Sequence, residues 1–161
     1  MGFRLASDEG VSSVQPVVQI VIPGRPVPKG RPRFSRRSGR AVTPKRTREY
    51  EKFCALCGRM AMVEAGFIAP LEGGIGLRVT ALFARPAQIG KAHKLWGRPG
   101  RVPLSGGGSY PDLSNVIKAI EDGLQGVVFV DDHQVCLLEG ARLYASDEDE
   151  PGVYVEVWRV H

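Results

Sequence analysis

Acidic side chains and one lysine recur between Tyr110 and Val135, in the stretch YPDLSNVIKAIEDGLQGVVFVDDHQV. Asp131 and Asp132 are adjacent, so their carboxylates repel each other unless a cation or a basic group lies near them. Carboxylate oxygens are hard ligands that suit Mg²⁺ or Mn²⁺. A metal held by them could activate a water and stabilise the charge that develops on a scissile phosphate. The stretch therefore indicates a candidate site for hydrolysis at phosphorus.

A helix and a short strand must position these groups. We expect a helix over residues 112–125, closed by Gly126, because apolar residues recur there at helical spacing. Its apolar stripe consists of Val116, Ile117, Ile120 and Leu124. A different face carries Asn115, Lys118 and Asp122, and Asp112 stands at the helix start. Residues 127–130, VVFV, predict a strand that ends at the acidic pair. If this strand packs beside the helix N-terminus, Asp112 converges on the pair.

Both features also have ordinary structural interpretations. Lys118 and Asp122 are one helical turn apart and could simply form a surface salt bridge. Asp131 and Asp132 could lie in a solvated turn, which would be the favoured interpretation if the pair stood alone. These residues alone therefore do not distinguish a functional site from ordinary surface structure, and the pattern of residues around them must do so.

A block of positive charge lies nearer the N-terminus. Between Arg25 and Arg48 the chain has ten Lys or Arg residues and no Asp or Glu, nearly half of its 22 basic residues. Like charges in such a block repel one another unless an anion neutralises them, and nucleic-acid phosphate is the usual anionic partner. The alternative is a solvated basic loop with no particular partner. The ten residues are Arg25, Lys29, Arg31, Arg33, Arg36, Arg37, Arg40, Lys45, Arg46 and Arg48.

The chain as a whole predicts one α+β domain, a mixed sheet of about five strands with two main helices. Residues 1–16 are expected to be a flexible tail, so the domain spans residues 17–161. The Pro- and Gly-rich residues 25–42 should run as an extended basic arm, and residues 85–109 should form a mobile basic loop. Strands are expected at residues 17–22, 74–83, 127–130, 134–144 and 152–160, and the first helix from Thr43-Pro44 to about Gly66.

Composition narrows the class of protein. The 161 residues are 43% hydrophobic and 24% charged, which is globular composition. No apolar run is long enough to span a bilayer, and residues 1–10 lack the layout of a secretory signal. We therefore expect a cytoplasmic protein that does not associate with membranes. As a DNA-binding protein it would lie at the nucleoid, and the sequence leaves open whether it is cellular or phage-encoded.

Cys54 and Cys57 form a C-x-x-C, which could indicate zinc or redox chemistry. A four-ligand zinc site is hard to assemble, because no second pair and no suitably spaced histidines follow. The motif also lies inside an expected helix and not at a strand-to-helix turn. We therefore interpret the pair as two thiols packed on a helix.

The acidic stretch resembles the RusA family of Holliday junction resolvases. The family pattern is P-D-x-D-N-x-x-K-x-x-x-D-x-L-N-G, followed shortly by D-D-x-Q-V. The upstream segment IPGRPVPKGRPRF also looks like the family's opening strand and Pro-Arg-Pro-Arg arm, so the resemblance covers most of residues 17–145. The matching residues of the acidic stretch are Pro111, Asp112, Asn115, Lys118, Asp122, Leu124, Gly126, Asp131, Asp132, Gln134 and Val135.

The resemblance implies a homodimeric endonuclease that resolves four-way or branched DNA with Mg²⁺, for which Mn²⁺ could substitute. Asp112 and Asp132 would be catalytic acids that bind the metal, with Asp131 beside them as a further ligand. Lys118 would be a catalytic or phosphate-contacting base, which makes chemical sense as a charge stabiliser. Besides Lys118, the residues expected to contact DNA are Arg25, Lys29, Arg31, Arg33, Arg36 and Arg37.

Ser114 departs from the family pattern, because it stands where the second Asp of D-x-D is usual. A neutral hydroxyl is a much weaker metal ligand than a carboxylate. Either the remaining acids suffice, with Asp122 or water as the additional ligand, or the metal site is impaired.

Two competing functions follow. The first is a branched-DNA-binding protein on the same scaffold that has lost catalysis through Ser114. The second is an unrelated metal-dependent phosphohydrolase acting on small phosphates. The basic arm argues against the second, since a small substrate does not need ten cations spread over 24 residues.

Overall fold

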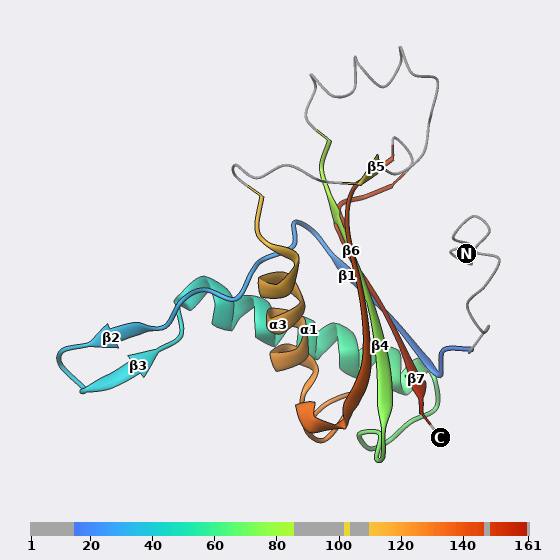
Figure 1. The fold of residues 1–161 in the computed structure, drawn as a ribbon. Coiled ribbons are helices and arrows are strands. Elements are labelled where there is room, and N and C mark those ends of the chain that lie inside the picture. Colours follow the sequence, from blue (N-terminus) through green and yellow to red (C-terminus); the bar gives the residue numbers. More distant parts are fainter. Residues whose placement is uncertain (1–14, 86–101, 104–109, 147–148, 161) are drawn as a thin grey trace, which may run out of the picture.

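A five-stranded mixed sheet and two helices make up the computed structural model, which describes residues 15–85, 102–103, 110–146 and 149–160 (Figure 1). The strands lie in the order β1-β7-β4-β6-β5, and only β4 and β6 are parallel among the paired neighbours of this sheet. This α+β architecture is the fold class that the sequence predicts. The sheet strands are β1 (Val18–Pro23), β4 (Ile75–Phe83), β5 (Val102–Pro103), β6 (Val135–Tyr144) and β7 (Gly152–Arg159).

The remaining elements are two helices, a 3₁₀ turn and a separate hairpin. Helix α1 spans Lys45–Glu64, helix α3 spans Leu113–Leu124, and the 3₁₀ helix η1 spans Asp132–Gln134. Strands β2 (Arg33–Ser35) and β3 (Arg40–Val42) pair only with each other. Figure 1 shows this hairpin projecting away from the sheet, beyond the start of α1.

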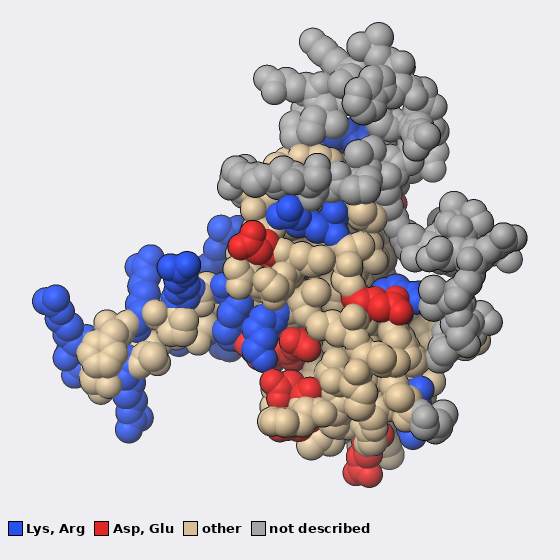
Figure 2. All heavy atoms as spheres, in the orientation of Figure 1, with Lys and Arg blue, Asp and Glu red and all other residues tan. Residues whose placement is uncertain are grey.

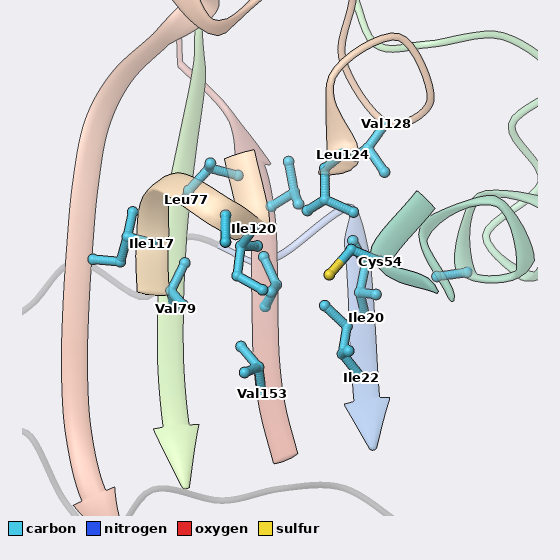
Figure 3. Packing of buried hydrophobic residues seen from close by; sticks show 14 of the residues in the cluster. Ile20, Ile22, Cys54, Leu77, Val79, Ile117, Ile120, Leu124, Val128 and Val153 are labelled. Carbon is cyan, nitrogen blue, oxygen red and sulfur yellow. The ribbon is translucent and has the colours of Figure 1, made fainter. Parts of the chain in front are cut away.

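One face of the sheet is buried under the helices, and the alternation of apolar residues that places them on this face is clearest in β1. In β1, for example, Val18, Ile20 and Ile22 are buried while the residues between them are exposed. Helix α3 lies over this face, and its predicted stripe is buried in full (Figure 3). Each such aliphatic side chain contributes about 1.5–3 kcal/mol when it leaves water. The residues of the stripe are Val116, Ile117, Ile120 and Leu124.

Helices α1 and α3 approach closely at Gly123. A Cβ atom built on Gly123 would stand 2.6 Å from Cys54 Cβ and 2.9 Å from the backbone oxygen of Glu51. Only a residue without a side chain therefore fits at this crossing. The close contact matters for the polar surface as well, because it brings the α1 residue Glu51 beside α3.

The cysteines have the helical setting that the sequence predicts. Cys54 and Cys57 both lie on α1, and all three thiols of the chain are free. Cys54 is completely buried, and this burial raises the pKa of its thiol to about 12. A thiol that stays protonated in this way serves packing and is a poor nucleophile or metal ligand.

The strand predicted at residues 127–130 is wrong. After α3 the chain makes a turn in which Phe129 forms isolated bridges with Leu71 and Gln125. The fifth strand of the sheet is β5, which comes from within the predicted loop at residues 85–109. A turn is favoured at this point because Gly126 adopts a φ of 75° and its N–H donates to the Phe129 carbonyl.

Two predicted segments lie largely outside the described residues. These are the tail at residues 1–16, of which only 15 and 16 are described, and the loop at residues 85–109 apart from Arg85 and β5. Within the described part of the chain, neither helix is both long and apolar enough to cross a bilayer.

The Gly123 contact predicts a stability difference between two helical glycines. In Gly123→Ala the new methyl group meets backbone, so overpacking of about 1–3 kcal/mol should outweigh the gain of up to about 1 kcal/mol in helix propensity. In Gly58→Ala the nearest atoms to the new Cβ belong to the side chains of Leu124 and Val128 and not to backbone, so the neighbours can shift at a lower cost. Urea unfolding should therefore show Gly123→Ala to be the less stable variant, and equal stability would contradict the assigned contact.

Candidate functional site

Helix α3 separates an apolar face from a charged one. Its stripe fixes the helix against the sheet, and Asn115, Lys118 and Asp122 consequently face away from the core, with Asp122 only partly exposed. The salt bridge between Lys118 and Asp122, which the sequence allowed as the ordinary structural interpretation, is present at 3.3 Å between Nζ and Oδ1. Further contacts show that this pair is part of a larger charged cluster.

The acidic pair lies in a hydrogen-bonded 3₁₀ turn and not at a strand end. Asp131 caps η1 by accepting from the His133 backbone N–H at 2.9 Å, and its own N–H donates to Gln134 Oε1 at 2.8 Å. The Gln134 amide nitrogen donates to the carbonyl oxygens of Leu71 and Gly73, each at 2.9 Å. Gln134 thus ties the turn to the segment before β4. Asp131 and Asp132 are therefore held in place, unlike residues of a freely solvated turn.

Lys118 joins helix α3 to this turn. Its ammonium donates to Asp132 Oδ2 at 3.1 Å and also contacts Asp122. Partial burial lowers the pKa of Lys118, but the hydrogen bonds to Asp132 and Asp122 outweigh that effect, and the pKa stands above its ordinary value. Lys118 is therefore a cation at neutral pH and cannot take up a further proton.

Lys29 adds a second ammonium to the cluster. Its Nζ lies 2.5 Å from Glu51 Oε1 and 2.6 Å from Asp122 Oδ2. Burial raises the pKa of Asp122, but the bonds from Lys29 and Lys118 outweigh it and leave the pKa below its ordinary value. Both oxygens of Asp122 are thus engaged by ammonium groups, whereas the sequence suggested a recruited metal ligand.

His133 was not identified as a site residue from the sequence. Its ring Nδ1 contacts Asp131 Oδ1 and lies 3.2 Å from Asp132 Oδ1. The hydrogen bond to Asp131 raises the pKa of the exposed imidazole. The one signal in the sequence was its place directly after two carboxylates, although D-D-x-Q-V leaves that position unspecified. Glu51 carried no such signal, because its role depends on how α1 packs against α3.

Asp112 stands apart from the acidic pair. It is the exposed N-cap residue of α3, and its side chain makes no capping hydrogen bond. Among the described residues, the possible metal-ligand atoms that lie within 4.8 Å of one another belong to Asp131, Asp132 and His133, without Asp112. Ser114 is exposed in the first turn of α3. Asp112 is thus not among the donor atoms that the structure brings within 4.8 Å of the acidic pair, so its expected convergence on Asp131 or Asp132 stays a prediction.

The basic arm forms the projecting hairpin β2–β3. Arg25 is exposed before the hairpin, and exposed guanidinium groups follow both of its strands, as the blue side chains in Figure 2 show. Phe34 lies among them with 70% of its surface exposed, although large aromatic side chains are usually buried. Sequence reasoning did not single out Phe34. The other exposed arginines of this segment are Arg31, Arg33, Arg36, Arg37 and Arg40.

Two comparisons with known proteins find similar sequences. The family model described as "Endodeoxyribonuclease RusA" matches residues 23–158, from the end of β1 almost to the end of β7. The chain is also similar to the "Uncharacterized protein YqaN" of Bacillus subtilis (strain 168). The two sequences are 26% identical over 145 residues, which cover 89% of this chain and 96% of that protein.

Gln134 provides a test of how the acidic turn is held. In Gln134→Glu a carboxylate oxygen replaces the amide nitrogen and faces two carbonyl oxygens, so the free energy of unfolding should fall by about 1–3 kcal/mol at pH 7. The same contacts should raise the pKa of the new carboxyl group above its unfolded value of about 4.3. The lost stability should therefore return as the pH falls below the folded pKa, because the protonated group can donate.

Urea unfolding between pH 4 and pH 7 measures this dependence. Gln15→Glu, at an exposed residue before β1, is the matched control and should change little. If the two variants were equally stable at pH 7, the structural role assigned to Gln134 would be wrong.

Proposed function

This chain belongs to the RusA endodeoxyribonuclease family, and on that premise we propose that it is a metal-dependent endonuclease that resolves Holliday junctions and other branched DNA. The observation that carries the proposal is the turn of Asp131 and Asp132 linked to Lys118 on α3. This arrangement combines carboxylates for a metal with a fixed ammonium for a phosphate. The projecting basic hairpin would supply a surface for DNA.

The donor set fits Mg²⁺, with Mn²⁺ as a substitute. Asp131, Asp132 and His133 offer ligand atoms within 4.8 Å of one another, and two of these three ligands are hard carboxylates. Asp112 is proposed as a further metal-binding acid, because its side chain is exposed and makes no capping hydrogen bond. When bound, the ion would activate water and neutralise charge on the reacting phosphate. Asp122 is the weaker candidate for a ligand, because both of its oxygens already accept from ammonium groups.

Lys118 would stabilise the phosphate directly. An ammonium has three N–H donors, and Asp122 and Asp132 engage two of them. The third donor can therefore bind a phosphate oxygen while the two carboxylates fix the position of the nitrogen. Its raised pKa keeps the group charged, so it would act as an electrostatic stabiliser and not as a proton acceptor.

The hairpin β2–β3 is proposed to bind the arms of the junction. Its arginines are exposed and carry charge well beyond the sheet (Figure 2). Phe34 is the one large apolar side chain on β2, and its exposure allows it to stack on unpaired bases near the crossover. A hairpin that offers cations and an aromatic ring together suits branched DNA better than a small phosphate substrate.

A second copy of the chain would complete the enzyme. Four large apolar residues of α1 follow a three-four-three spacing and are between 37% and 71% exposed, which is the pattern of a helix–helix seam. In a parallel pairing, Arg59 of one copy would face Glu64 of the other. A two-fold dimer would present two sites to the two equivalent strands of a junction. The seam residues are Phe53, Leu56, Met60 and Val63.

Cleavage of labelled four-way junctions tests the proposed activity. The chain should make paired, symmetric cuts near the crossover with Mg²⁺ or Mn²⁺, and far fewer cuts in matching linear duplex. Asp132→Asn should lower cleavage by at least about a hundredfold while junction binding is kept, because it removes a metal-binding carboxylate beside Lys118. Glu72→Gln, at an exposed acid outside the cluster, is the control.

The same assay distinguishes a nuclease from a branched-DNA-binding protein that has lost catalysis through Ser114. Junction binding without cleavage in either metal ion, with cleavage restored by Ser114→Asp, would show that the chain is an impaired binder. Full cleavage by Asp132→Asn would instead overturn the metal site proposed at the acidic turn.

Salt dependence tests the DNA surface. Each phosphate contact that is lost should reduce the slope of log affinity against log salt by about 0.9 for duplex DNA. The triple variant Arg33→Gln, Arg36→Gln, Arg37→Gln should therefore bind junctions more weakly at low salt and with a shallower slope. Arg159→Gln, at the exposed end of β7 and far from the hairpin (Figure 1), should leave the slope unchanged. Equal slopes for both variants would exclude the hairpin as the phosphate-binding surface.

A further inference from the structure

Five charged groups from four segments alternate in sign across the site. The order is Glu51 of α1, Lys29 after β1, Asp122 and Lys118 of α3, and Asp132 of η1. Every neighbouring pair in this series lies within 3.3 Å. The position of each ammonium therefore depends on the carboxylates on both of its sides. A change at Lys29 would reach Asp132 through Asp122 and Lys118.

The segment that carries Lys29 is fixed between the two helices. The Lys29 backbone N–H donates to the Asn115 carbonyl at 2.7 Å, and the Gly30 N–H donates to Thr47 Oγ1 at 3.1 Å. Thr47 is 2% exposed, and a Cβ on Gly30 would meet its oxygen at 2.9 Å. The backbone at Lys29 is thus anchored to α3 and α1, in contrast to the exposed hairpin that follows.

The ammonium of Lys29 limits how Asp122 can bind Lys118. Lys29 engages Asp122 Oδ2, so Lys118 is left with the other oxygen, Oδ1, at the longer distance of 3.3 Å. Without Lys29, Asp122 would offer both oxygens and its full charge to Lys118. Lys118 would then be drawn toward Asp122 and away from Asp132.

The geometry points to Lys29 as a positioning residue that, by binding Asp122 and Glu51, keeps the Lys118 ammonium beside Asp132 for the reacting phosphate. This inference rests on the proposed function, and it assigns Lys29 a role other than the DNA contact that its place in the basic arm suggests. The side chain of Lys29 is 24% exposed and already contacts two carboxylates, whereas the arginines of the hairpin are exposed. Lys29 therefore belongs to the site by its contacts and to the arm only by sequence.

Single-turnover cleavage and junction binding together test this role. Lys29→Met should lower the cleavage rate at saturating enzyme by about ten- to a hundredfold, because small misplacements of a catalytic group have effects of that size. Junction affinity and its salt slope should stay near those of the parent chain. Lys29→Met should have little further effect in a Lys118→Met background, since it acts through Lys118. Lys29→Arg, which keeps the charge between the two carboxylates, should restore most of the rate.

The ¹H–¹⁵N signal of the Lys118 ammonium gives a readout that needs neither metal nor activity. This signal should shift in Lys29→Met and should return toward its original position in Lys29→Arg. If Lys29→Met does not fold, Lys29→Met combined with Glu51→Gln removes one of the uncompensated carboxylates, and the same measurements apply to it.

Three outcomes would overturn the proposal. The first is a shallower salt slope for Lys29→Met with an unchanged cleavage rate. The second is independent effects of the Lys29 and Lys118 substitutions on the cleavage rate of the double variant. The third is a Lys118 ammonium signal that does not shift in Lys29→Met. Failure of the parent chain to cut any DNA would count against the proposed function alone. In that case the Lys118 signal still decides whether Lys29 positions Lys118.

Discussion

The close crossing of α1 and α3 at Gly123 is the contact on which the site depends. With no side chain at Gly123, the two helix backbones come together over the sheet, and Cys54 fills the space beside them. The apolar stripe of α3 is buried by this packing, so its charged face turns outward. Glu51 comes beside Asp122 only because the helices meet there. Packing in the core thus sets which charges are neighbours on the surface.

Alternation of sign explains how so many charges share one small region. Carboxylates alone would repel one another, and two lysines alone would as well. Here Lys29 and Lys118 lie between the acids, which lowers the pKa of Asp122 and raises that of Lys118. The cluster is partly exposed, so its contribution to stability is modest because water screens such pairs. What these contacts provide is orientation, because a lysine held by two carboxylates has a defined position.

The arginine-rich hairpin and the charged cluster are joined by one short segment. After β1 the chain contacts α3 and α1 at Lys29 and Gly30, where Lys29 joins the charged cluster, and then continues into the arginine-rich hairpin (Figure 1). The hydrogen bonds at Lys29 and Gly30 anchor the base of that hairpin. The base of the hairpin is therefore fixed to both of the helices that contribute to the charged cluster.

Much of this could be predicted from residue order alone. Helical spacing identified the buried stripe of α3 and the separate face of Lys118 and Asp122, because the 3.6-residue period determines which side chains share a face. Proline and glycine ruled out a helix in the arm, and the pairing of Lys118 with Asp122 follows from their separation by one turn. The sequence could not distinguish a strand end from the capped turn at Asp131, because the short apolar run VVFV fits either.

Tertiary structure decided which distant charges meet. From the sequence, Lys29 was grouped with the arginines as a DNA contact, because its neighbours in sequence are basic. Only the packing of α1 against α3 places it between Glu51 and Asp122. His133 joins the acidic pair through the tight geometry of η1. Sequence spacing determines contacts within one element, where the backbone fixes the distance between residues. Contacts between elements depend on how the core packs, and no local pattern encodes that distance.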